Sequence, residues 1–313
     1  MKRGQMHMGT LVFITAVGPD QATIQQAINA GFAEIHRLEL LWSTWIPTSE
    51  LSQVNAAAGQ YPVQVSEDSL QLLEASLKMA QLTNGGFNIA VGPAVTAWNV
   101  MENESIPSDS LLNALKSKVA LSEIHINPDL KTVWLGQEGM QLDVGGIAKG
   151  LAADLAVQKM KEQGATAGVV AVSGDIKTFG RLPEEQRFIF GIQHPRKEQG
   201  VLMARIALEN EAVSTAGDYQ RFFMKEGVRY HHILDPHTLK PSSRSQSVTV
   251  VAKEGVWADG LDTGIFVMGP KDGLALLERL PDVEGVIVGE DGRVWVSSGL
   301  QPRLMWEEGV SSR

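Results

Sequence analysis

Five strand-like segments follow one another between residues 168 and 252, and this succession limits the possible folds more than any other feature of the chain. They lie near 168–173, 187–193, 201–208, 228–234 and 246–252. Consecutive strands that lack a crossover helix pair antiparallel, whereas parallel pairing needs a long connection. The segments therefore predict a mostly antiparallel sheet.

Helical patterns flank these strands. Apolar residues recur at three- and four-residue spacing after Asp20, Ser66 and Ser108, each of which can cap a helix. The other expected elements are helices at about 147–163, 256–268 and 271–280, strands at 9–17, 141–144, 284–288 and 293–297, and a hairpin over 123–136. The predicted class is α+β, with mostly antiparallel sheets flanked by helices. Residues 1–313 are expected to form one domain of two lobes.

Composition excludes several classes of function. The net charge is −9 with Lys and Arg scattered, so the basic face of a nucleic-acid binder is absent. The sequence contains no Cys, which excludes disulfides, thiolate metal sites, a Cys nucleophile and a lipid-modified cysteine. No apolar run is long enough for a transmembrane segment, and no secretory signal is visible. As written, the chain is expected to be cytoplasmic; a periplasmic or membrane-associated location is the alternative if a signal has been removed.

A metal site is suggested by Asp259, Asp262 and Thr263. On a helix these residues sit at i, i+3 and i+4 and share one face. Two carboxylates one turn apart repel each other unless a cation lies between them. Carboxylate and hydroxyl oxygens suit Mg²⁺, which also takes phosphate oxygens. The other reading is a solvated polar face on a surface helix, and spacing of this kind is common by accident.

A glycine turn precedes the helix expected at 147–163. Gly145 and Gly146 end the strand expected at 141–144, and Lys149 lies in the first helical turn. Backbone N–H groups at a helix N-terminus bind phosphates, and Lys149 adds a cation. A pyrophosphate cradle and a plain glycine turn remain equally compatible with this pattern.

His231, His232 and His237 fall within seven residues of one another. Neighbouring residues on a strand face opposite sides, so a zinc site of convergent histidines is not expected. One inward-facing histidine could act as a general base, because its pKa lies near neutrality. A core histidine bonded to Asp235 or to a backbone carbonyl is the other reading.

Two further segments could line a ligand site or simply form turns, namely 85–93 and 214–219. Trp42, Trp45 and Trp98 could stack on a flavin or adenine ring, but tryptophans more often belong to the core.

The order of these motifs resembles the ApbE family of FAD:protein FMN transferases, from Met8-Gly9-Thr10 to about Val296. The matching motifs are Trp42 to Trp45, Ser49-Glu50-Leu51, Asn55, Gly86-Phe87-Asn88, Val91-Gly92-Pro93, Asp143 to Gly150, Gly174-Asp175-Ile176, Gly191 to Arg196, Ser214 to Tyr219, His232 to Pro236 and Ala258 to Thr263. The resemblance implies an ApbE-like (T-fold-like) architecture with two lobes around a flavin cleft.

The resemblance also implies site residues. The metal would be held by Asp259, Thr263 and the Ala148 carbonyl, with Asp262 as a further ligand. The positions that would contact FAD are Trp42, Gly86, Phe87, Asn88, Gly145, Lys149, Leu151, His232 and Ile233. Lys149 and His232 would touch phosphate, and His232, Asp259 and Lys149 would be the catalytic residues.

Four positions depart from the family pattern. Asn88 replaces the usual Asp, and Leu151 replaces a tyrosine, so a charge and a hydroxyl are lost. Ser173 and Leu239 each stand where a glycine is usual. These changes bear on FAD affinity and acceptor choice rather than on the metal and phosphate residues.

The implied reaction is Mg²⁺-dependent transfer of FMN from FAD to a Thr or Ser hydroxyl of an acceptor protein, with release of AMP. The implied acceptors are subunits of electron-transport complexes or flavin reductases. Two alternatives remain open from the sequence: an FAD pyrophosphatase, in which water replaces the acceptor hydroxyl, and a non-catalytic flavin carrier, which would need no Mg²⁺ ligands.

Overall fold

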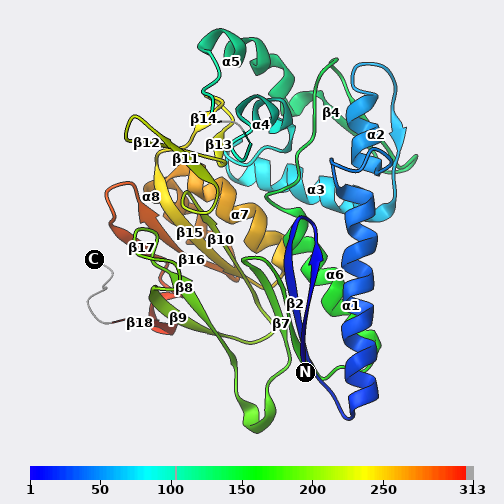
Figure 1. Cartoon of the computed structure of the whole chain (residues 1–313), viewed down its shortest axis with the longest axis vertical. Helices are drawn as coiled ribbons and strands as arrows, with labels where there is room; N and C mark the ends of the chain where they lie inside the picture. Colours follow the sequence, from blue (N-terminus) through cyan, green and yellow to red (C-terminus); the bar gives the residue numbers. More distant parts are fainter. Residues whose placement is uncertain (103, 308–313) are drawn as a thin grey trace.

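An eight-stranded sheet forms the centre of the computed structural model, which describes residues 1–102 and 104–307 (Figure 1). Every neighbouring pair in the sheet is antiparallel. Across the sheet the order is β1 (Lys2–His7), β2 (Thr10–Val17), β6 (Ala167–Val172), β7 (Asp175–Phe179), β10 (Ala212–Gly217), β15 (Ser245–Ala252), β16 (Val283–Gly289) and β17 (Val294–Val296). The predicted α+β class with antiparallel sheet is confirmed.

Helices cover one face of this sheet. The four are α1 (Gln21–Trp42), α6 (Ala148–Glu162), α7 (Gly255–Met268) and α8 (Pro270–Leu277). Helix α1 packs on β2, α6 on β6 and β7, α7 on β10 and β15, and α8 on β16. Asp20 caps α1 as expected, because its side chain accepts the Thr23 N–H at 2.8 Å. The helices thus place residues from distant parts of the chain above the middle strands.

A second, three-stranded sheet covers part of the other face. It consists of β8 (Phe188–Gln193), β9 (Leu202–Leu208) and β18 (Leu304–Trp306), with β9 in the middle. Its apolar side chains pack against Val213, Val251 and Val286 of the large sheet. Strand β15 is buried at all eight positions, since it lies between α7 and this second sheet.

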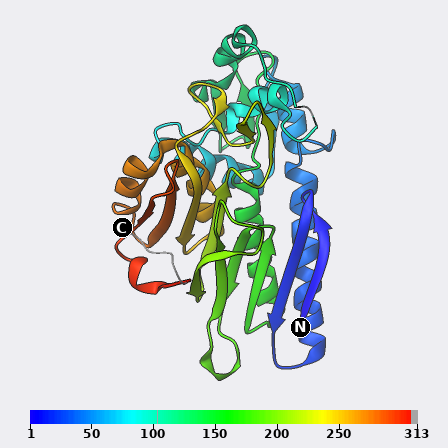
Figure 2. The same cartoon turned by 60° about the vertical axis from the view of Figure 1, so that its left-hand side comes forward.

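Most of the remaining elements gather at one end of the molecule, the upper end in Figures 1 and 2. They are α2 (Glu50–Ala56), α3 (Glu67–Leu82), α4 (Gly92–Trp98), α5 (Asp109–Leu115), β3 (Val63–Gln64), β4 (Ile124–Asn127), β5 (Thr132–Leu135), β11 (Phe222–Lys225), β12 (Val228–His231), β13 (Leu234–Asp235), β14 (Lys240–Pro241) and the short 3-10 helices Ile89–Val91, Lys116–Val119 and Leu121–Glu123. Their core is continuous with α7 through residues such as Met79, Leu261 and Ile265. Two further 3-10 helices, Pro183–Glu185 and Gln301–Arg303, lie instead in the connections that lead into β8 and β18. The division into two lobes around a flavin cleft stays a prediction.

Two expected elements were wrong. Residues 141–144 form no strand and join no sheet, because Leu142 pairs with the Asn55 side chain through both its N–H (2.6 Å) and its carbonyl (3.1 Å). Residues 212–217 form the central strand β10 rather than a turn. The small residues of β10 allow α7 to pack closely on it, and their low hydrophobicity hid the strand from the sequence pattern.

Within the described residues, no helix combines the length and the apolar composition needed to cross a bilayer.

Candidate functional site

Three buried aspartates meet where α7 crosses the middle strands. Asp259 and Asp262 lie on α7 and Asp175 begins β7, and their exposed fractions are 2%, 2% and 5%. The two helical aspartates share one face, as their spacing predicts. They do not form the solvated surface that was the alternative reading. We call Asp175, Asp259 and Asp262 the acidic cluster.

Lys149 and Ser214 bridge the acidic cluster. The Lys149 ammonium donates to Asp175 and lies 3.9 Å from Asp259 Oδ1. Ser214 Oγ contacts both Asp175 Oδ1 and Asp262 Oδ2. Because a hydroxyl has one proton, Ser214 can donate to only one of these carboxylates unless the other is protonated. The arrangement therefore holds more negative charge than its own donors neutralise.

The pKa values of Asp259, Asp262 and Lys149 are all raised, in part by this excess of negative charge. Burial raises the pKa of Asp259, and the Asp175 charge adds to the shift. Burial also raises the pKa of Asp262, and Asp259 and Asp175 add to it. Burial alone would lower the Lys149 pKa, but Asp175 and Asp259 raise it above its ordinary value, so this lysine stays charged.

Helices α6 and α7 cap each other next to the acidic cluster. Asp259 Oδ2 of α7 accepts the Gly150 N–H of α6 at 2.8 Å. Asp154 of α6 accepts the N–H groups of Gly255 and Val256 at the start of α7, at 2.7 and 3.0 Å. Neither helix has a side-chain cap from its own N-cap residue. The positive end of each helix thus faces an aspartate of the other.

This capping changes the role predicted for the glycine turn. The Gly145 N–H donates to Asp143 Oδ1 at 2.8 Å, and the Gly150 N–H is bound to Asp259. These donors are therefore not free to cradle a phosphate, and the positive end of α6 stabilises Asp259 instead. Gly145 itself is exposed, and the Lys149 side chain is 25% exposed, so both remain within reach of a ligand.

Thr263 and Gly146 lie side by side at the edge of the acidic cluster. Thr263 Oγ1 is 3.1 Å from Asp262 Oδ1, and a Cβ on Gly146 would lie 3.2 Å from Thr263 Oγ1. The Gly150 N–H that would bond the Gly146 carbonyl in a regular helix goes to Asp259 instead, which frees that carbonyl. Ala148 is the first residue of α6, so its carbonyl accepts within the helix. A carbonyl oxygen has two lone pairs, so the predicted Ala148 carbonyl and the Gly146 carbonyl are both candidate metal ligands.

The donor set of this site suits a hard divalent cation. Carboxylate, hydroxyl and carbonyl oxygens are the ligands of Mg²⁺ in proteins. A divalent cation would also relieve the mutual repulsion that raises the pKa of Asp259 and Asp262. The residues present therefore fit Mg²⁺.

Four side chains predicted to contact FAD are enclosed in the core. Trp42 and Leu151 are 2% exposed, Phe87 is 3% and Ile233 is 5% exposed. The Trp42 Nε1–H donates to Ser69 Oγ at 3.1 Å, so its polar atom is satisfied inside the protein. Trp42 and Leu151 pack in the core that also contains residues of α6 and α7, and their contact with FAD stays a prediction. Trp45, by contrast, is 85% exposed.

Gly86 and Asn88 serve local structure. A Cβ on Gly86 would lie 2.9 Å from the Gly264 carbonyl, so the residue allows its loop to touch α7. Asn88 caps a 3-10 helix (Ile89–Val91) through the Ala90 N–H at 2.7 Å and donates to the Val119 carbonyl at 2.9 Å. Both amide atoms of Asn88 are thereby occupied.

The neighbouring histidines face different surroundings. The strand expected over 228–234 is interrupted, since β12 ends at His231 and His232 lies in the bend that follows. His231 is 4% exposed; its Nδ1 accepts the Ile233 N–H at 3.2 Å, so Nε2–H donates to the Ser242 carbonyl at 2.8 Å. It faces Phe266 and a cavity of about 460 Å³. His232 is half-buried, and burial, followed by the charge of Arg221, lowers its pKa. His232 therefore stays neutral at physiological pH, and the positive charge of Lys149 also reaches it.

Sequence reasoning gave no role to Asp175, Ser214 or Arg221. Asp175 completes the acidic cluster, and Ser214 contacts two of its carboxylates. The Arg221 carbonyl accepts the His232 backbone N–H at 3.1 Å. Asp175 and Ser214 could have been found from the sequence, because each lies inside a motif that matches the family, Gly174-Asp175-Ile176 and Ser214 to Tyr219. Their contact with α7 depends on sheet order, which the sequence does not reveal.

Comparison with known proteins gives consistent matches. The profile of the ApbE family matches residues 8–287. An FAD:protein FMN transferase of Treponema pallidum is 32% identical over 96% of this chain and 88% of its own length. One from Vibrio cholerae is 30% identical over 91% of this chain and 86% of its own length. The crystal structure of the ApbE protein from Thermotoga maritima superposes with a TM-score of 0.88 at 28% identity, covering 97% of this chain and 98% of that one.

Proposed function

The chain belongs to the ApbE family, and from this premise we propose that it transfers FMN from FAD to a Ser or Thr hydroxyl of an acceptor protein. The observation that carries the proposal is the acidic cluster, which places three buried carboxylates and a lysine beside the exposed glycine turn. In the reaction, the acceptor oxygen bonds to the FMN phosphorus, the pyrophosphate P–O bond breaks, AMP leaves and the hydroxyl proton passes to a base.

Asp259, Asp262, Thr263 and a backbone carbonyl of the 146–148 turn would hold Mg²⁺. When bound, Mg²⁺ supplies positive charge that neutralises pyrophosphate oxygens. Neighbouring residues hold the carboxylate ligands in place. Ser214 and Lys149 fix the carboxylates, and α6 directs its positive end at Asp259.

Lys149 and His232 would act on the reacting groups. The partly exposed ammonium of Lys149 can reach a phosphate while it remains paired with Asp175. His232 is neutral and half-buried, so it can accept the proton of the acceptor hydroxyl. Asp259 is the alternative base, although its carboxylate already accepts the Gly150 N–H.

The acidic cluster argues against a passive flavin carrier, because a carrier has no use for several buried, mutually repelling carboxylates. An FAD pyrophosphatase would use the same cluster. The proposed acceptors are flavoprotein subunits of electron-transport complexes or flavin reductases, in which a phosphoester-linked FMN sits on Ser or Thr.

The test compares transfer with hydrolysis. The enzyme is incubated with FAD, Mg²⁺ and an acceptor flavoprotein in its unflavinylated form; the acceptor is followed by intact mass, and AMP and free FMN are quantified. The matched control is the same acceptor with its target Ser or Thr replaced by Ala. If the enzyme is a transferase, the acceptor mass rises by one FMN minus one water for each AMP formed. With the Ala control acceptor, almost no FMN transfer or AMP release is expected. Equal AMP and free FMN with either acceptor would instead establish a pyrophosphatase.

A further inference from the structure

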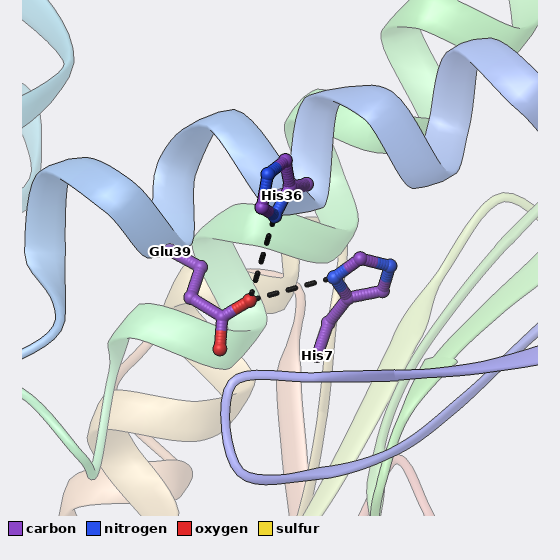
Figure 3. Close-up of side chains that lie close together, drawn as sticks. All are labelled: His7, His36 and Glu39. Atoms are coloured by element: carbon purple, nitrogen blue, oxygen red, sulfur yellow. Dashed lines mark hydrogen bonds and ion pairs between the residues drawn. The ribbon is translucent and has the colours of Figure 1, made fainter.

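His7, His36 and Glu39 converge away from the acidic cluster, where the β1–β2 hairpin meets α1 (Figure 3). One potential ligand atom of each lies within 4.8 Å of those of the other two. His7 Nδ1 is 3.4 Å from Glu39 Oε2, and His36 Nδ1 is 3.9 Å from the same oxygen. We call these three residues the hairpin cluster.

Neighbouring groups orient the hairpin cluster. Gln5 Oε1 lies 3.0 Å from His7 Nε2 and can only accept, so Nε2 carries a proton. The lone pair of neutral His7 then sits on Nδ1, directed at Glu39. The other oxygen of Glu39, Oε1, accepts the Met8 N–H at 2.6 Å. In metal sites, hydrogen bonds of this kind fix the tautomer and orientation of the metal-bound histidines and carboxylates.

Two acceptor atoms, His7 Nδ1 and Glu39 Oε2, consequently face each other and need a cation or a proton between them. Zn²⁺ binds imidazole nitrogen and carboxylate oxygen at about 2.0–2.2 Å, so two ligands of a tetrahedral ion lie roughly 3.3–3.5 Å apart. The 3.4 Å between His7 Nδ1 and Glu39 Oε2 matches this spacing. The 3.9 Å to His36 needs only a small movement of an exposed ring.

We propose that the hairpin cluster binds a divalent transition-metal ion of the Zn²⁺ class. Two imidazoles and one carboxylate form a set that Zn²⁺ prefers and Mg²⁺ does not. The His7 and Glu39 side chains are 12% and 22% exposed, whereas His36 is 58% exposed and leaves an entry path. The ion would join β1 to α1 across 28 or more residues of chain and hold the turn at Met8 and Gly9, both of which have positive φ.

The test is titration of the metal-free protein with Zn²⁺, and separately with Co²⁺, in excess Mg²⁺ to occupy the acidic cluster. The proposal expects one equivalent of Zn²⁺, a Zn²⁺-dependent rise in melting temperature, and visible Co²⁺ absorption from nitrogen ligands in a low-symmetry site. His7→Gln and His36→Gln should each weaken binding at least tenfold. His125→Gln, which removes an exposed histidine stacked on Trp134, should bind like the wild type.

His36→Gln is the decisive variant, because its exposed ring makes misfolding an improbable explanation for lost binding; circular dichroism checks its fold. Wild-type affinity in this variant would overturn the proposal, as would failure of the wild type to bind Zn²⁺. Binding at the acidic cluster alone would show itself by loss of the ion in Asp259→Asn and not in the histidine variants, and this result would also overturn it. None of these outcomes depends on FMN transfer, so the proposed function is tested separately.

Discussion

Individual side chains at this site have roles set by their immediate neighbours. The pKa of Asp259 is raised because burial and the Asp175 charge outweigh the stabilisation from Lys149 and from the Gly150 N–H of α6. His231 and His232 are adjacent in sequence, yet one is bonded into the core and the other is half-buried beside Arg221. Local spacing predicted which residues share a face, but partners distant in sequence determine what each one does.

The histidine pair gives a prediction at this scale. His232→Ala should transfer FMN at least about tenfold more slowly with nearly unchanged FAD affinity, since a general base contributes about 10²–10⁴-fold in rate. Because the folded pKa of His232 is lowered, its protonation should depress the rate only at acidic pH, below the neutral range. Single-turnover rates across pH, with FAD affinity from fluorescence titration, check both points.

His231→Ala is the matched variant and should act differently. It removes a buried ring with two hydrogen bonds, so its melting temperature should fall, and any loss of rate should follow the loss of folded protein. A stable but inactive His231→Ala, together with an active His232→Ala, would assign the base to the other residue.

At the scale of elements, the crossing of α6 and α7 holds the site together. The two helices exchange aspartate caps, and they approach closely at Gly150 and Gly255. The sequence indicated both helices within one or two residues, because their apolar periodicity and start signals are local. Their crossing could not be predicted, since nothing in either segment identifies the other as its partner.

Gly150→Ala tests this crossing. A Cβ there would overlap the Gly255 carbonyl and lie 2.7 Å from Asp259 Cβ, so the helices must separate. We expect a loss of about 1–3 kcal/mol in unfolding free energy and a larger loss of transfer, because Asp259 moves. Chemical denaturation and FMN-transfer assays measure the two effects.

Gly174→Ala is the control, since it lies next to Asp175 but its Cβ would meet only Gln220 Nε2, at 4.0 Å. Its stability and transfer should stay close to wild type. Unchanged stability in Gly150→Ala would show that the close approach of α6 and α7 is not needed.

At the scale of the whole molecule, the sheet order creates the acidic cluster. Residues 149, 175, 214, 259 and 262 are brought together because β7, β10 and β15 are neighbours beneath α6 and α7. The sequence predicted the α+β class and antiparallel pairing from consecutive strands. It missed β7 and β10, which carry Asp175 and Ser214, because both strands are short and poor in large apolar residues. Asp175, one of the three aspartates of the acidic cluster, and its partner Ser214 were consequently visible only in three dimensions.

The central claim is that the acidic cluster holds the Mg²⁺ on which transfer depends. Asp259→Asn tests it cleanly, because the amide oxygen can still accept the Gly150 N–H while the charge is lost. Removal of one of three buried like charges should leave the metal-free melting temperature no lower than that of the wild type.

The measurement is the rate of FMN transfer to an acceptor protein as Mg²⁺ is titrated into metal-free enzyme, for the wild type and for Asp259→Asn. The wild type should be inactive in EDTA and saturate with Mg²⁺. The folded variant should be slower by about 10²-fold or more at every Mg²⁺ concentration, as expected when a group that stabilises transition-state charge is lost. Wild-type activity in EDTA, or equal rates for the two proteins, would contradict the account.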